Sequence, residues 1–240
     1  MTEIRRIDNE GLALNTVHEG DCLTVMKEIP GKSVDLVVTD PPYLMNYQSR
    51  RRVVSEQFRK IDNDVDSHEL ISDYIAECHR ILKDDTAMYM FCSWHHIDFF
   101  KTEFERYFKL KNLIVWNKNN HGSGDLKGSY APKHEFVLFG HKGRTLFREK
   151  RIPDVIDCAK ISSTKLTHPT EKPQDLLGLF IRNSSDAGDV VFDGFAGTGS
   201  TTLSAIANGR NALTIELDSN YVAIAQRRID EALALKVGGL

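Results

Sequence analysis

Short apolar runs alternate with amphipathic stretches along most of the chain. Val34 to Thr39 is an apolar run that stops at Pro41-Pro42, which is typical of a buried strand followed by a turn. Between Leu70 and Leu82 the apolar residues instead recur at helical spacing, and Ser67 is placed to cap this helix. Strands that alternate with helices predict an α/β fold with a doubly wound, mostly parallel sheet.

The same reasoning predicts the remaining elements, with Pro173 in the first turn of one helix. Residues 44–66 lack periodicity and are expected to form a mobile loop on the catalytic side, residues 119–133 are also expected to be a loop, and residues 142–167 show no strong period. Strands are expected over residues 87–91, 110–116, 136–139, 189–192 and 212–217, and helices over residues 23–29, 96–106, 173–184, 200–207 and 220–234.

The composition suits one globular domain. The 240 residues are 41% hydrophobic and 27% charged, enough for a single domain over residues 1–240 with at most a small insertion. The start of the chain is polar, without the apolar segment of a secretion signal, and no apolar stretch is long enough for a membrane span. The four cysteines form no Cys-x-x-Cys pair, so we expect no metal site, and scattered thiols favour the cytoplasm.

Positive charge is concentrated in two segments although the net charge is −3. Residues 44–60 and residues 142–151 each carry five basic residues against one acidic residue. A single basic run is usually a solvated loop, but two of them beside the same half of the chain favour contact with phosphates. The candidate nucleic-acid contacts are Arg50, Arg51, Arg52, Arg144, Arg148 and Arg151.

The first segment with candidate chemistry is Asp40-Pro41-Pro42-Tyr43, directly after the strand at residues 34–39. Asp-Pro is also a common opening for a turn, so these four residues alone are weak evidence. Two further strand ends, Phe91 to Trp94 and Trp116 to Asn119, are expected on the same side of the sheet.

The second segment is the loop from Asp193 to Gly199, between a strand and a helix. Gly197 and Gly199 permit positive φ and a close approach of the backbone to a ligand. The loop lacks the third glycine of a dinucleotide site and the lysine of a Walker loop. Glu216, at the end of the next strand, is spaced either to accept hydrogen bonds from ribose hydroxyls or to be a surface glutamate.

These two segments, joined to His168-Pro169-Thr170-Glu171-Lys172-Pro173, resemble the β class of amino-methylating DNA methyltransferases over residues 15–228. The catalytic segment precedes the glycine loop, which is the circularly permuted motif order of that class. The resemblance implies the Rossmann-like class I S-adenosylmethionine-dependent methyltransferase fold, with S-adenosylmethionine as the cofactor. Gly194 departs from the family, which usually has proline after the aspartate.

The resemblance also assigns roles at the cofactor. Phe195 would support the cofactor, Lys172 would face its carboxylate, Glu216 would bind the ribose, and Asp21 would lie near the adenine. Asp21 is an equally good cap for the helix that follows it. The full set of expected cofactor-binding residues is Asp21, Asp40, Lys172, Asp193, Phe195, Gly197, Gly199 and Glu216.

The expected catalytic residues are Asp40, Pro41, Pro42 and Tyr43. An exocyclic amine is a poor nucleophile because its lone pair is delocalised into the ring. Asp40 and the carbonyl of Pro41 would accept its two hydrogens and favour a tetrahedral nitrogen, and the two prolines would hold both acceptors in place. Tyr43 would stack on the base after it is flipped out of the helix.

The activity predicted from these residues is methylation of the N6 amine of adenine in duplex DNA. Aspartate at the first position of the tetrapeptide favours adenine, and cytosine N4 is the alternative. An inactive cofactor- or DNA-binding subunit and an RNA or protein methyltransferase also stay open. Methylation of a cytosine ring carbon is set aside, because that chemistry needs a Pro-Cys pair and no cysteine here follows a proline.

In this family the region that recognises the target sequence lies between the strand that ends here near Gly140 and the His-Pro-Thr segment. Here only residues 142–167 are available, which predicts a short target sequence, relaxed specificity, or completion by a second subunit. A homodimer and a cognate restriction enzyme are further partners that the resemblance allows. The target sequence and the biological role do not follow from the residues.

Overall fold

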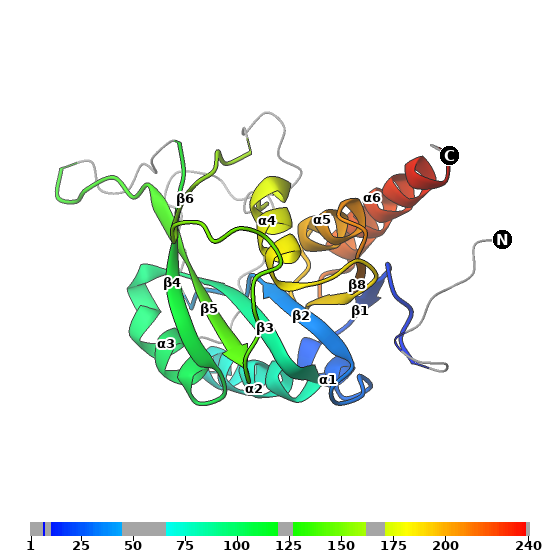
Figure 1. Cartoon of the computed structure of the whole chain (residues 1–240), viewed down its shortest axis with the longest axis horizontal. Helices are drawn as coiled ribbons and strands as arrows, with labels where there is room; N and C mark the ends of the chain where they lie inside the picture. Colours follow the sequence, from blue (N-terminus) through cyan, green and yellow to red (C-terminus); the bar gives the residue numbers. More distant parts are fainter. Residues whose placement is uncertain (1–6, 8–10, 45–65, 120–126, 162–170, 239–240) are drawn as a thin grey trace.

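One twisted sheet runs through the computed structural model, which describes residues 7, 11–44, 66–119, 127–161 and 171–238. In these residues the strand order is β1-β8-β7-β2-β3-β5-β4-β6 (Figure 1). The strands are β1 (Val17–Glu19), β2 (Val34–Thr39), β3 (Leu82–Cys92), β4 (Lys109–Asn117), β5 (His134–Lys142), β6 (Val155–Asp157), β7 (Val190–Asp193) and β8 (Asn211–Glu216). The helices are α1 (Cys22–Met26), α2 (Asp66–Ile81), the 3-10 turn η1 (Trp94–His96), α3 (Ile97–Glu105), α4 (Gln174–Ser184), α5 (Ser200–Ala207) and α6 (Ser219–Gly238).

The sheet is mostly parallel, as the alternation of strands and helices predicts. Only β5 runs antiparallel to its neighbours β3 and β4 within the part of the chain that the structure describes. The sequence analysis did not predict the edge strands β1 and β6, because three residues are too few to show a period. β3 begins five residues before its predicted start, since the exposed polar residues 83–85 interrupt the apolar pattern.

Successive side chains of the central strands pack alternately into two hydrophobic cores, one on each face of the sheet. In β3, Met88, Met90 and Cys92 pack with residues of α1, α2 and α3. Tyr89 and Phe91, between them in sequence, pack with α4 on the other face. Successive strand residues point to opposite faces, so both faces are covered by helices and the central strands are apolar almost throughout (Figure 1).

Two helices begin at capping residues that the sequence contains, but the predicted cap of α2 is wrong, because α2 begins at Asp66 and Ser67 lies within it. The Asp21 side chain accepts a hydrogen bond from the backbone N–H of Thr24 at 2.9 Å, which confirms its role as an N-cap. Asp218 accepts one from the N–H of Asn220 at 2.8 Å, at the start of α6. Pro173, predicted in the first turn of α4, is instead the N-cap residue, one position before the helix begins.

Several predictions concern residues outside the described ranges. They include the expected mobile loop at residues 44–66, except for Leu44 and the first residue of α2, and the end of the expected recognition region at residues 142–167. Arg50, Arg51, Arg52 and residues 168–170 also lie outside them. Among the helices that are described, none combines the length and apolar character needed to cross a bilayer.

The parallel strands β2, β3, β7 and β8 end along one edge of the sheet, which we call the carboxyl edge. Asp40 follows β2, Asp193 ends β7 and Glu216 ends β8. Because β5 is antiparallel, its first residues reach this same edge. Ligands of open α/β sheets bind outside the carboxyl ends of the strands.

Tyr74 of α2 explains why glycine stands at position 194. The backbone N–H of Gly194 donates to the Tyr74 hydroxyl at 3.1 Å. A Cβ atom added at Gly194 would lie 2.5 Å from the Tyr74 ring, which is too close for any real contact. A proline here would lose the donor and meet the ring, so the departure from the family pattern is compensated by a buried tyrosine.

We expect Gly194→Ala to lower the free energy of unfolding by about 2 kcal/mol, because the new methyl group overpacks a core site. Gly194→Pro should cost more, since it also leaves the Tyr74 hydroxyl without its donor. Urea denaturation of both variants measures the difference. Wild-type stability of Gly194→Ala would show that Tyr74 can move aside.

Candidate active site

Asp40 lies at the centre of a cluster of charged side chains. Its carboxylate forms an ion pair with the ammonium group of Lys172, just before α4, and that lysine side chain is only 8% exposed. The Tyr43 hydroxyl donates to Asp40 Oδ1 at 2.6 Å. The structure therefore brings together three predicted site residues from both halves of the chain.

Two residues that the sequence analysis did not assign complete this cluster. Glu135 Oε2 lies 3.4 Å from Lys172 Nζ and accepts a hydrogen bond from the Tyr43 hydroxyl at 3.2 Å. Glu135 Oε1 accepts a hydrogen bond from Lys118 Nζ at 2.6 Å. Lys118 belongs to a strand end already placed on this side, but Glu135 gave no signal because it precedes the predicted strand. We call Asp40, Tyr43, Lys118, Glu135 and Lys172 the Asp40 cluster.

Burial and charge set the protonation states in the Asp40 cluster. Burial raises the pKa of Asp40, although the Lys172 ammonium opposes this shift. Burial acts to raise the pKa of Glu135, but Lys172 and Lys118 outweigh it and the pKa lies below its ordinary value. Burial acts to lower the pKa of Lys172, and the two carboxylates outweigh it and raise that pKa. The two carboxylates and the two ammonium groups of the cluster are thus paired with one another.

The loop after β7 has the backbone shape that the sequence predicts. Gly197 and Gly199 have φ values of +52° and +84°, in the left-handed region that favours glycine. A Cβ atom at Gly197 would meet nothing within 4 Å, so the loop presents open space at this residue. The Gly197 N–H donates to Glu216 Oε2 at 2.7 Å, which links the loop to the end of β8.

These residues fit a cofactor that carries ribose hydroxyls. Glu216 also accepts a hydrogen bond from the Asp218 N–H at 2.9 Å, so each carboxylate oxygen is fixed and keeps lone pairs for further donors. Burial raises the pKa of Asp193 to about 6, and its Oδ1 accepts from the Thr39 hydroxyl at 2.9 Å. The expected contact of Lys172 with the cofactor carboxylate stays a prediction, because its ammonium group is engaged by Asp40 and Glu135.

The structure places the second basic segment away from the carboxyl edge. The Arg144 N–H donates to Asp85, near the start of β3, at 2.8 Å. Arg148 is ion-paired with Asp186, beyond the end of α4 that lies far from Lys172. Both arginines are therefore at the edge opposite Asp40. Lys142, counted in the same basic segment, is buried and donates to backbone carbonyls at the end of α2.

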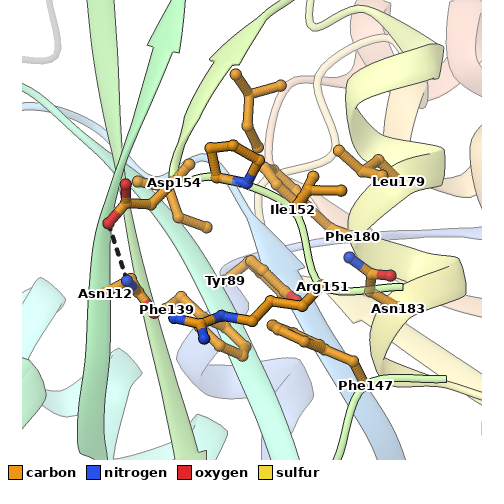
Figure 2. Close-up of a pocket in the computed structure, with 13 residues that line it drawn as sticks. Tyr89, Asn112, Phe139, Phe147, Arg151, Ile152, Asp154, Leu179, Phe180 and Asn183 are labelled. Carbon is orange, nitrogen blue, oxygen red and sulfur yellow. Dashed lines mark hydrogen bonds between the residues drawn. The ribbon is translucent and has the colours of Figure 1, made fainter. Parts of the chain in front are cut away.

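Arg151 lines a cavity of about 360 Å³ on the α4 face of the sheet (Figure 2). Its walls include Phe139, Phe147 and Phe180, and Figure 2 shows Arg151 extending among them. None of the predicted catalytic or cofactor-binding residues lines this cavity. The predicted catalytic residues lie at the carboxyl edge, and this cavity is a separate feature.

Metal ligation has no support in the described ranges. They contain no group of three or more histidine, cysteine, aspartate or glutamate side chains that could hold a metal ion. Cys22, Cys78 and Cys92 are buried in the core, and Cys158 is half-buried.

The sequence matches a known family over most of its length. The model of a family described as DNA methylase matches residues 34–227. The DNA adenine methyltransferase YhdJ of Escherichia coli is 30% identical in an alignment 264 residues long, gaps included. The alignment covers 96% of this chain and 86% of YhdJ.

Solved structures share the fold at lower identity. The M1.HpyAVI complex with S-adenosylmethionine superposes with a TM-score of 0.66 at 24% identity, over 89% of this chain and 98% of that one. The cytosine-N4-specific PvuII DNA methyltransferase gives a TM-score of 0.68 at 17% identity, over 93% of each chain.

We expect Gly197→Val to abolish binding of S-adenosylmethionine, because the side chain would project into the open space of the loop. The left-handed φ adds strain of about 1–2 kcal/mol that could also lower stability. Gly188→Val is the matched control, since Gly188 has a φ of +88° and open space but lies in the turn before β7. Calorimetry should show affinity lost in Gly197→Val and kept in Gly188→Val; equal affinities would overturn the loop assignment.

Proposed function

Because the chain belongs to the family of S-adenosylmethionine-dependent DNA methylases that act on exocyclic amines, we propose that it methylates the N6 amine of adenine in duplex DNA. The observation that carries this proposal is the hydrogen bond between Thr39 and Asp193. It joins the last residue of β2, directly before Asp40, to the last residue of β7, directly before the glycine loop. The acceptor for the amine and the loop for the methyl donor are thus neighbours on one edge.

The chemistry follows from what Asp40 can accept. When bound, S-adenosylmethionine supplies an electrophilic methyl group on a sulfonium. Asp40 accepts a hydrogen bond from the target amine, and this withdraws the nitrogen lone pair from the ring and makes the nitrogen more nucleophilic. The side chains contribute position and charge, and no covalent intermediate with the protein is required.

Adenine is the proposed base for two reasons. Aspartate occupies the first position of the tetrapeptide, and YhdJ, at 30% identity, is an adenine methyltransferase. Cytosine N4 is the second candidate, because the PvuII enzyme has the same fold. A homodimer, a cognate restriction enzyme and a cytoplasmic site of action stay predictions of the sequence.

We expect Asp40→Ala to abolish methyl transfer while binding of S-adenosylmethionine is largely kept, because Asp40 acts on the amine. Mixed-sequence duplex DNA is incubated with either protein and the cofactor, digested, and analysed as nucleosides by mass spectrometry. N6-methyladenine with the wild type alone supports the proposal. N4-methylcytosine would move the activity to the second candidate, and activity of Asp40→Ala would remove Asp40 from the mechanism.

We also propose that two lysines at the carboxyl edge contact DNA. Lys133 directly precedes β5, and its carbonyl accepts a hydrogen bond from the Lys118 N–H at 2.8 Å. Lys160 lies two residues after Cys158, and the Cys158 N–H donates to the backbone carbonyl of Asn117 at the end of β4. Both lysines are exposed and lie beside the strand ends near the Asp40 cluster. Arg144 and Arg148 lie at the opposite edge.

We expect the double variant Lys133→Ala/Lys160→Ala to weaken DNA binding and to reduce the salt dependence by about two phosphate contacts. Arg144→Ala/Arg148→Ala removes the same charge and is the matched control, with a smaller effect. Fluorescence anisotropy at several salt concentrations separates the two. A larger loss of DNA affinity in the arginine variant would show that residues 142–151, and not the two lysines, contact the phosphates.

A further inference from the structure

Both oxygens of the Asp40 carboxylate are already engaged in the Asp40 cluster. Oδ1 accepts from the Tyr43 hydroxyl at 2.6 Å, and Oδ2 is paired with Lys172. In the proposed function Asp40 has to accept a hydrogen bond from the target amine. Each oxygen keeps a lone pair for the amine, but an ammonium group on the same carboxylate draws on its negative charge and weakens a further hydrogen bond. A second anion that shares the Lys172 ammonium group therefore makes Asp40 a better acceptor.

Glu135 is that anion. Its Oε2 lies 3.4 Å from Lys172 Nζ, so a small rotation of the lysine side chain is enough to shorten this contact. Lys118 holds the other oxygen, Oε1, at 2.6 Å. Glu135 also stands in the ladder between β4 and β5, opposite Trp116. The carboxylate is therefore fixed on a rigid strand with one oxygen anchored and the other facing the lysine.

We propose that Glu135 is a positioning residue of the methyl transfer, which takes over the Lys172 ammonium group when the target amine binds Asp40. This inference rests on the role of Asp40 given under the proposed function. Glu135 also balances charge, because the attacked nitrogen gains positive charge as the methyl group arrives. With Glu135 the cluster is neutral, whereas without it Lys172 and Lys118 leave a net positive charge that opposes the reaction.

The groups that face Asp40 determine how the rate should depend on pH. Tyr43 and Cys92 of β3 stay protonated, since burial raises the pKa of both, that of Cys92 to about 12. Burial raises the pKa of Asp193 of β7 to about 6, so Asp193 changes its charge in the same pH range in the wild type and in the Glu135 variants. Lys172 before α4 and Glu135 of β5 stay charged. A change in the charge of Glu135 therefore reaches Asp40 directly and leaves the other groups in place.

The test is the pH profile of single-turnover methyl transfer with bound cofactor. Glu135→Gln keeps the shape of the side chain and removes its charge. We expect its rate to fall about 10-fold to 100-fold. Asp40 acts as the ionised acceptor, so the rate rises with pH through its pKa. Loss of the neighbouring negative charge lowers that pKa. The acid limb, meaning the part of the profile in which the rate rises with pH, should therefore move to lower pH by about one unit.

Lys118→Gln should displace the acid limb of the pH profile in the opposite direction. Removing this ammonium group leaves Glu135 without its second partner, makes the surroundings of Asp40 more negative, and should move the acid limb to higher pH. Glu135→Asp, which keeps the charge, should restore part of the rate. The charge control is Glu105→Gln on α3, an exposed residue paired only with Lys101 in the described chain, which should leave rate and limb unchanged.

The outcomes separate this inference from the proposed function. Opposite displacements of the limb in Glu135→Gln and Lys118→Gln, with unchanged affinity for S-adenosylmethionine, support it. A rate of Glu135→Gln within twofold of wild type overturns it, and so does a slower rate with an unmoved limb, which marks a merely structural role. If Asp40→Ala itself is active, Asp40 leaves the mechanism and this inference loses its premise. Absence of N6-methyladenine with the wild type would instead overturn the proposed function.

Discussion

A buried chain of hydrogen bonds holds the two functional segments of this protein together. Asp193 accepts from the Thr39 hydroxyl, so Thr39 has to accept from Tyr74, and Tyr74 accepts from the Gly194 N–H. Each of these four buried polar groups therefore has a partner, which matters because an unpaired buried group costs about 1–3 kcal/mol. The order of donors leaves only one arrangement of the β2 and β7 ends, and the distance between Asp40 and the glycine loop depends on it.

The Asp40 cluster sits beside this chain and has a different purpose. Bringing two carboxylates and two ammonium groups out of water costs about as much as their attraction returns, so the cluster is not explained by stability. Its residues come from the ends of three strands, β2, β4 and β5, and from the segment just before α4. A neutral cluster with one mobile ammonium group suits a reaction that creates positive charge on the substrate.

The basic residues show how a count of charges differs from a surface. Residues 142–151 looked like a phosphate-binding segment, yet Lys142 is buried at the end of α2 and Arg148 pairs with Asp186. The direction of β5 carries this segment to the edge opposite Asp40. The DNA-facing cations are instead expected among single lysines beside the strand ends, which no run in the sequence marks.

The sequence by itself determined the mostly parallel α/β sheet, the place of Asp40 directly after a buried strand, and the glycine loop. These depend on local information, namely the period of apolar residues, the stop at two prolines and the glycines that permit positive φ. Glu135, the edge strand β6 and the placement of Arg144 were decided only by the tertiary structure. They depend on which strands pair and in which direction, and that choice is made by burial of residues far apart in the chain.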